Sequence, residues 1–186
     1  MPATRVLLID DHTLVRKGME ELLRSRGVEV VAAVGTGEEG VNRALALHPD
    51  IVLLDIRMPI MNGIETLTRL RECGVTVPVL MLTMSRDDAD LRAALRGGAQ
   101  GYLLKDMDPE DLVPALEAAL RGESIVAKEM VGSLARMVKD EPTDAAPVAT
   151  PFAELTAREQ EILLHVAEGQ SNKMIARALN ITDGTV

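Results

Sequence analysis

The chain has 186 residues, enough for about one to two domains, and 47% of them are hydrophobic although only 1% are aromatic. The scarcity of aromatic side chains disfavours proteins that read single-stranded nucleic acid by base stacking. A net charge of -9, from 20 basic and 29 acidic residues, argues against nonspecific binding to nucleic acid or anionic membranes. The single cysteine, Cys73, excludes an internal disulfide and a cysteine-rich zinc site. Because the start lacks the features of a signal peptide and no apolar run approaches about 18 residues, we expect a cytoplasmic protein without membrane partners.

Short aliphatic runs alternate with longer helical patterns from residue 5 to about residue 121, which is typical of an α/β protein with a parallel sheet. Several runs lack polar alternation, as strands buried on both faces do. The helices between them carry start signals, including the capping box of Thr36 and Glu39 and the pair Asp108 and Pro109. We predict a five-stranded, doubly wound parallel sheet with strands at 6–9, 28–34, 51–54, 79–82 and 101–104.

The rest of the chain divides into a linker and a second periodic region. A helix at about 127–138 precedes residues 139–151, which carry three prolines among small and acidic residues. Two short helices then follow, and Thr182 can cap a third. The chain ends at Val186, about one turn into that helix, so we expect it to be the front part of a small all-α domain. We predict three segments, at 1–122, 123–151 and 152–186.

Polar residues follow four of the predicted strands. Asp10 and Asp11 come directly after the first strand, Asp55 after the third, Thr83 after the fourth and Lys105 after the fifth. In doubly wound sheets, ligands bind beyond the carboxyl ends of the strands. Converging carboxylates repel one another unless a cation compensates, and an all-oxygen cluster suits Mg²⁺. The pattern therefore predicts a magnesium site at this edge.

A carboxylate at such a site can act as the nucleophile toward a phosphoryl group. Asp55 is the better candidate because it stands alone after its strand, which leaves the adjacent acidic pair for the metal. Mg²⁺ and Lys105 would neutralise charge on the transferred oxygens, and the Thr83 hydroxyl would donate a hydrogen bond to them. The loop at 56–63 is rich in turn formers and can offer a backbone carbonyl to Mg²⁺.

These residues resemble the receiver domain of two-component response regulators over about residues 4–122. The motifs that carry the resemblance are LLIDDH at 7–12, LLDIRMPIMNGIE at 53–65, LT at 82–83 and GAQGYLLKD at 98–106. The resemblance implies a flavodoxin-like fold and a signalling protein, not an enzyme, that takes part in its own phosphorylation and dephosphorylation.

The resemblance also implies a role for each residue of the site. Asp55 would be the phosphoacceptor and a metal ligand, and the backbone carbonyl of Arg57 would complete the Mg²⁺ ligands begun by Asp10 and Asp11. Thr83 and Lys105 would assist the transfer. Thr83 and Tyr102 would be the switch, with Tyr102 turning inward on phosphorylation.

The segment LTAREQEILLHVAEGQSNKMIARALNITDGTV, at 155–186, resembles the front of the LuxR-type helix-turn-helix. Together with the receiver motifs it indicates the NarL/FixJ subfamily, in which a sensor histidine kinase is the phosphodonor, promoter DNA is the target and phosphorylation favours a homodimer. Thr182 and Thr185 are then the candidate DNA contacts. Residues 152–186 carry a net charge of -2 and stop before the recognition helix is complete, so we expect this form not to bind DNA specifically.

Two other classes of function remain open from the residues themselves. A phosphatase or phosphotransferase could use an aspartyl-phosphate, but such enzymes typically carry D-x-D after the first strand, whereas this chain has Asp10 and Asp11 adjacent. A stand-alone receiver could act by docking alone, against which the segment 155–186 counts. Steady turnover of a phosphate ester would favour the enzyme, and stoichiometric labelling would favour the regulator. His12 is expected to line the acidic pocket or to cap the first helix.

Overall fold

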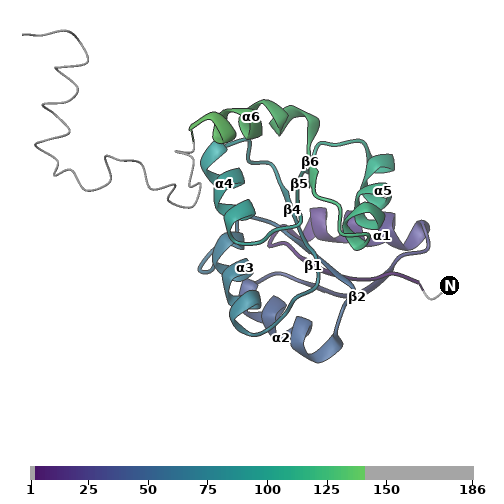
Figure 1. Cartoon of the computed structure of the whole chain (residues 1–186). Coiled ribbons are helices and arrows are strands. Elements are labelled where there is room, and N and C mark those ends of the chain that lie inside the picture. The colour runs from purple at the N-terminus through teal and green to yellow at the C-terminus, as the bar shows by residue number, and fades with distance from the viewer. Residues whose placement is uncertain (1–2, 141–186) are drawn as a thin grey trace, which may run out of the picture. The chain divides into compact units, whose positions relative to one another are not determined.

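The computed structural model describes residues 3–140, which form a parallel sheet covered by helices on both faces (Figure 1). The predicted helix starts are largely confirmed: Thr36 accepts a bond from the backbone of Glu39, and Asp108 caps a helix with Pro109 at its first position. The capping box of Thr36 and Glu39 is only half formed. Its reciprocal bond from the Thr36 backbone to the Glu39 carboxylate is missing, because that carboxylate pairs with Arg43 instead. The strands are β1 Arg5–Ile9, β2 Glu29–Val34, β3 Ile51–Leu54, β4 Val79–Thr83, β5 Gly101–Leu104 and β6 Ile125–Val126. The helices are α1 Thr13–Ser25, α2 Gly37–Leu47, α3 Gly63–Glu72, α4 Asp88–Arg96, α5 Pro109–Leu120, the 3₁₀ turn η1 Lys128–Met130 and α6 Val131–Asp140.

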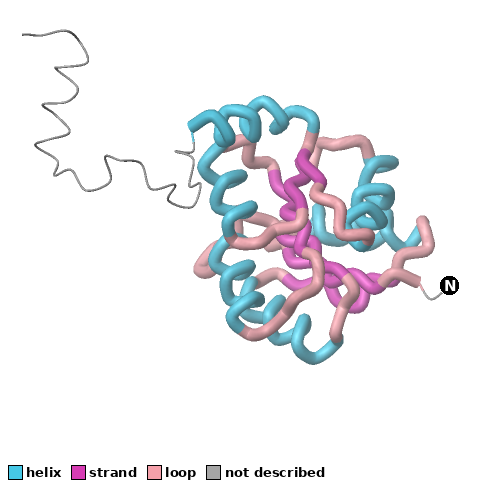
Figure 2. The backbone as a smooth tube through the Cα atoms, viewed as in Figure 1, coloured by secondary structure: helices cyan, strands magenta, loops and turns pink. Residues whose placement is uncertain are grey.

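The sheet has the order β2-β1-β3-β4-β5-β6, and every pairing in it is parallel. The prediction of five strands is corrected to six, because Ile125 and Val126 pair with Gly101 and Tyr102 at the edge. A two-residue strand has no periodicity that a sequence pattern can register. Thr83, expected just after β4, is its last residue. Figure 2 shows the strands running through the centre of the molecule between the two layers of helices.

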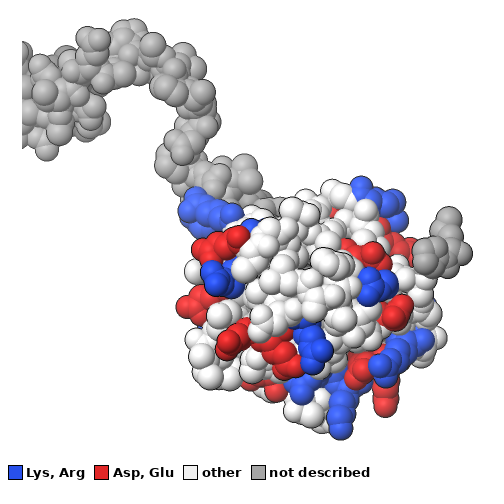
Figure 3. Space-filling view, turned by 90° about the horizontal axis from the view of Figure 1, so that it is seen from below, with Lys and Arg blue, Asp and Glu red and all other residues white. Residues whose placement is uncertain are grey.

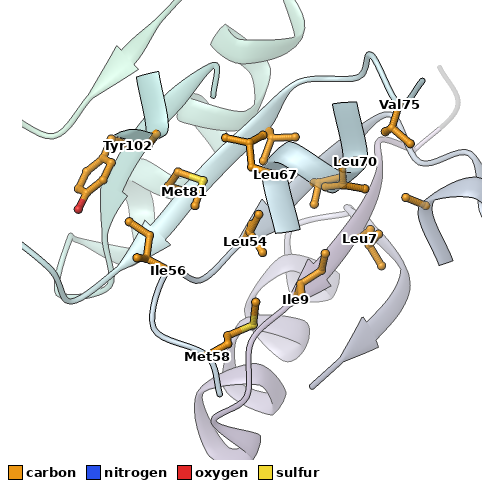
Figure 4. Packing of buried hydrophobic residues seen from close by; sticks show 14 of the residues in the cluster. Leu7, Ile9, Leu54, Ile56, Met58, Leu67, Leu70, Val75, Met81 and Tyr102 are labelled. Carbon is orange, nitrogen blue, oxygen red and sulfur yellow. The ribbon is translucent and has the colours of Figure 1, made fainter. Parts of the chain in front are cut away.

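The core lies in two layers, one on each face of the sheet. One layer joins side chains of β1, β3 and β4 to those of α2, α3, α4 and α6, and part of it is drawn in Figure 4. The other layer packs the opposite strand faces against α1 and α5. Aliphatic residues dominate both layers, in keeping with the 1% of aromatic residues in the sequence, and β3 and β4 are buried along their whole length.

The helix predicted at 127–138 is present as η1 followed by α6, and it belongs to the core of the α/β domain. Met130 and Met137 are buried in the layer that contains α4, and the guanidinium of Arg136 contacts the carboxylate of Asp88 on α4 at 3.0 Å. The helix thus packs beside α4 (Figure 1). Within residues 3–140, no helix is long and apolar enough to cross a membrane.

Candidate functional site

Three carboxylates meet at the carboxyl edge of the sheet, as their positions after parallel strands predicted. Asp10 follows β1 and Asp55 follows β3, and both residues are buried. One ligand atom from each of Asp10, Asp11, His12 and Asp55 lies within 4.8 Å of the others. The central strands β1 and β3 are paired in regular register from Val6 and Ile51 onward, so their ends bring the acids together.

Lys105 joins this cluster from the end of β5. Its Nζ lies 2.7 Å from Oδ2 of Asp10 and 2.7 Å from Oδ2 of Asp55, and its side chain is almost entirely buried. Burial lowers the pKa of Lys105, but the hydrogen bonds and charges of the two carboxylates outweigh it and hold that pKa above its ordinary value. The ammonium therefore stays charged and offsets part of the acidic cluster.

The donor set of the cluster fits a hard divalent cation. Oδ1 of Asp11 is buried and has no hydrogen-bond partner among the described residues, although a buried carboxylate oxygen ordinarily has one. Nδ1 of His12 lies 2.9 Å from that oxygen, so the imidazole lines the pocket, and the side chain of His12 makes no helix-capping bond. A Mg²⁺ ion bound by these oxygens would satisfy the unpaired atom and the uncompensated charge.

Gly63, the first residue of α3, allows the helix to start directly against the end of β3, beside Asp55. A Cβ added at Gly63 would lie 2.1 Å from the carbonyl oxygen of Asp55 and 2.7 Å from Cα of Ile56. The helix start is held by a full capping box between Asn62 and Glu65, which sequence reasoning missed although the N-x-x-E spacing was present. Close packing here fixes the backbone of Asp55.

The two candidate switch residues are connected through Ser85. The Thr83 hydroxyl is buried and accepts a hydrogen bond from the Ser85 backbone N–H at 3.1 Å, and the Tyr102 hydroxyl donates to the Ser85 carbonyl at 2.9 Å. Burial raises the pKa of Tyr102 to about 12. Tyr102 is fully buried beside Met81 and Ile56 (Figure 4), so the inward orientation that we expected to follow phosphorylation is already present here.

The side chain of Arg57 makes a contact that its predicted role, as a backbone-carbonyl ligand, does not include. Its guanidinium pairs with the Asp90 carboxylate on α4 at 2.7 Å, and the same carboxylate accepts a bond from the Ser85 hydroxyl at 2.5 Å. Sequence spacing could not reveal this contact, because 33 residues separate its two partners. The loop after Asp55 is thereby tied to α4.

Not every predicted site residue lies in the described part of the chain. Thr182 and Thr185, the candidate DNA contacts, fall outside it, as do the segments predicted from residue 141 onward. Asp10, Asp11, Asp55, Thr83 and Lys105 lie at the carboxyl edge of the sheet.

Comparison with known proteins matches both parts of the chain. Residues 6–117 match the response regulator receiver domain, and residues 153–186 match the bacterial regulatory proteins of the luxR family. The nitrate/nitrite response regulator protein NarL of Escherichia coli K12 is 42% identical over 186 residues, which cover 100% of this chain and 84% of that protein. The response regulator protein VraR of Staphylococcus aureus is 36% identical over 98% of this chain and 84% of its own length.

A solved structure agrees with these matches. The two-component response regulator of the LuxR family from Aurantimonas sp. SI85-9A1 has a TM-score of 0.70 and 32% identity, over 74% of this chain and 99% of that chain. The buried acids and lysine at the strand ends, the receiver match and the luxR match agree with one another. The chain belongs to the two-component response regulators with a LuxR-type DNA-binding domain, and it is a phosphorylation-dependent transcriptional regulator.

Proposed function

We propose that the carboxylate of Asp55 accepts the phosphoryl group from a sensor histidine kinase, with Mg²⁺ held by Asp10, Asp11, Asp55 and the backbone carbonyl of Arg57. The observation that carries this proposal is the pairing of Asp55 with Lys105 at 2.7 Å, beside a buried Asp11 oxygen that lacks a hydrogen bond. Asp55 alone among the three acids stands singly after its strand, and the start of α3 fixes its backbone.

In the transfer, an oxygen of Asp55 forms a bond to phosphorus while the N–P bond of the kinase's phosphohistidine breaks. The imidazole leaves with the electron pair and takes a proton from water. Bound Mg²⁺ would neutralise negative charge on the phosphoryl oxygens. Lys105, already placed between Asp10 and Asp55, exchanges one carboxylate contact for a phosphoryl oxygen, and the Thr83 hydroxyl donates a hydrogen bond to another.

The signal leaves the site through the contacts of Ser85. When Thr83 turns its hydroxyl to the phosphoryl group, it stops accepting the bond from the Ser85 N–H, so the phosphorylated state differs from the free state by a specific contact. Ser85 also holds Tyr102 and Asp90, which places α4 next in the path. Amide NMR spectra with beryllofluoride, a phosphoryl mimic, should change around Ser85 and Tyr102, and unchanged spectra would contradict this path.

We propose that the output belongs to residues 152–186, joined to the receiver segment predicted at 1–122 by the linker predicted at 123–151. Of that linker, β6, η1 and α6 pack against the sheet and α4. We propose that Thr182 and Thr185 contact promoter DNA when the recognition helix is complete, that phosphorylation favours a homodimer on it, and that the protein acts in the cytoplasm. Acidic and basic side chains are interspersed on the face that Figure 3 displays, so this face has no extended patch of one charge. Any electrostatic contact with DNA is therefore expected to be local. Sedimentation with and without beryllofluoride tests the dimer, and a mass unchanged by the mimic would contradict it.

The phosphoacceptor is tested by incubation with acetyl phosphate and Mg²⁺, followed by intact-protein mass measurement. The wild-type chain should gain one acid-labile phosphoryl group, and Asp55→Asn should gain none. Asp106→Asn is the matched control, because Asp106 is an exposed acid at the same edge and pairs with Arg86 instead of Lys105. Labelling of Asp55→Asn at the wild-type level would refute the assignment.

A further inference from the structure

The imidazole of His12 is directed at the acidic site and not at the helix that follows it. His12 is the N-cap residue of α1, yet its side chain makes no capping bond. Its backbone is fixed, because its N–H donates to Oδ1 of Asp10 at 2.8 Å and its carbonyl accepts from the N–H of Arg16 at 2.9 Å. The side chain is 62% exposed, so burial in the core does not explain its position. The backbone therefore holds the ring beside the carboxylates.

The distances from Nδ1 of His12 to the three carboxylates suit ligands that share one ion. The nitrogen lies 2.9 Å from Oδ1 of Asp11, 3.6 Å from Oδ1 of Asp10 and 4.0 Å from Oδ2 of Asp55. Two atoms that each bind a metal at about 2.1 Å can be at most about 4.2 Å apart, and neighbouring ligands of an octahedron are about 3.0 Å apart. All three distances satisfy that limit, and the 2.9 Å contact matches neighbouring ligands.

The close contact between His12 and Asp11 is not a hydrogen bond. Oδ1 of Asp11 has no hydrogen-bond partner among the described residues, although the imidazole nitrogen lies 2.9 Å away. The ammonium of Lys105 contacts Asp10 and Asp55 and leaves this oxygen uncompensated. A cation between the imidazole and the Asp11 carboxylate would give both atoms a partner.

A nitrogen ligand changes which ions a site of oxygen ligands prefers. Oxygen ligands and water suit Mg²⁺, whereas imidazole suits Zn²⁺, Ni²⁺ and Cu²⁺. Imidazole is also the commonest metal ligand among protein side chains. We propose that Nδ1 of His12 is a metal ligand, so that the site of Asp10, Asp11 and Asp55 selects divalent transition ions over Mg²⁺. The inference rests on the proposed function, because it assumes that these carboxylates hold a divalent cation.

The test is calorimetric titration of the wild type and His12→Asn with Ni²⁺ and with Mg²⁺, in a buffer that binds neither ion. Carboxylates favour Ni²⁺ without any help from imidazole, so the decisive quantity is the change that the substitution makes in each Kd. We expect His12→Asn to raise the Kd of Ni²⁺ by at least about tenfold and that of Mg²⁺ by less than about twofold. Retained binding of Mg²⁺ also shows that the variant is folded.

His48→Asn is the matched control. It removes an imidazole at the opposite edge of the sheet, before β3, from a left-handed position that asparagine tolerates, so both Kd values should stay at the wild-type level. Direct ligation has its own signature in the ¹H NMR spectrum with Co²⁺ bound. A strongly shifted, exchangeable imidazole proton should appear in the wild type and in His48→Asn, and it should be missing from His12→Asn.

The possible results separate the inference from the proposed function. An unchanged Kd of Ni²⁺ in His12→Asn, or a wild-type spectrum without the shifted proton, would overturn ligation by His12. Equal losses of affinity for Ni²⁺ and Mg²⁺ would overturn it too, because they would indicate that His12 only shapes the acidic cluster. A wild-type chain that binds no Mg²⁺ would instead refute the proposed function.

Discussion

Replacing Asp11 with asparagine should stabilise the metal-free protein, even though Asp11 is proposed to bind the metal. Asp10, Asp11 and Asp55 place carboxylate oxygens within 4.8 Å of one another, and the single ammonium of Lys105 contacts only two of them. Oδ1 of Asp11 has no hydrogen bond within the described residues, and its one close contact is with Nδ1 of His12 at 2.9 Å, so the substitution removes few stabilising interactions. The new amide can also donate to a neighbouring carboxylate.

The expected gain can be bounded from the geometry. Two unit charges 4.8 Å apart repel by about 3 kcal/mol at an effective dielectric constant of about 20. The Asp11 side chain is 27% exposed, so solvent screens part of this repulsion, and we expect a net gain of about 1–2 kcal/mol in the free energy of unfolding. For a protein of this size, that corresponds to an increase of about 3–6 °C in Tm.

The assay is thermal unfolding followed by circular dichroism at neutral pH, in a chelator and then in Mg²⁺. At a Mg²⁺ concentration ten times its Kd, the wild type should gain about 1.4 kcal/mol, whereas Asp11→Asn should gain less than half of this. Asp106→Asn should respond to Mg²⁺ like the wild type, because Asp106 lies outside the cluster. A lower Tm of Asp11→Asn in the chelator, or an undiminished response to Mg²⁺, would refute the electrostatic reasoning.

Tyr102 is the only tyrosine, so the ultraviolet absorbance of tyrosinate should titrate with a midpoint near the folded pKa of about 12, against about 10 in denaturant. Because the pKa of Tyr102 is higher in the folded state, the stability that this hydroxyl contributes is complete below about pH 10 and is lost as the pH rises toward 12. A titration midpoint near 10 in the folded protein would contradict burial of the hydroxyl. Gly63→Ala should lower the free energy of unfolding in urea by about 1–3 kcal/mol or more and should slow labelling of Asp55. Gly18→Ala, where nothing lies within 4 Å of the added Cβ, should be stabilising in the same assay. Equal effects of the two substitutions would argue against the close approach of Gly63 to the backbone of Asp55. Asn62→Ala should cost about 1 kcal/mol through loss of the cap of α3 in the same assay, and an unchanged stability would show that the cap contributes nothing.

Much of the site was predictable because its residues lie at fixed places relative to strands. Parallel strands end at the same edge, so the acids after β1 and β3 and the lysine after β5 had to converge once the α/β alternation was recognised. The predicted roles of these residues followed from carboxylate and ammonium chemistry at that edge. The start of α5 was equally predictable from the sequence, because an N-cap residue followed by proline is a signal contained within a few residues.

Contacts between distant segments were not predictable from spacing. The pair of Arg57 with Asp90, the burial of Met137 against the sheet and the inward position of Tyr102 depend on how α4 and α6 pack, which no local pattern encodes. The strand β6 forms only because β5 offers an unpaired edge to two residues. The positive φ of Ile60 likewise arises where the loop must turn between β3 and α3, in spite of the local preference of a β-branched residue. Local signals therefore specified the elements and the residues at their ends, whereas packing between elements set the side-chain contacts that link the site to α4.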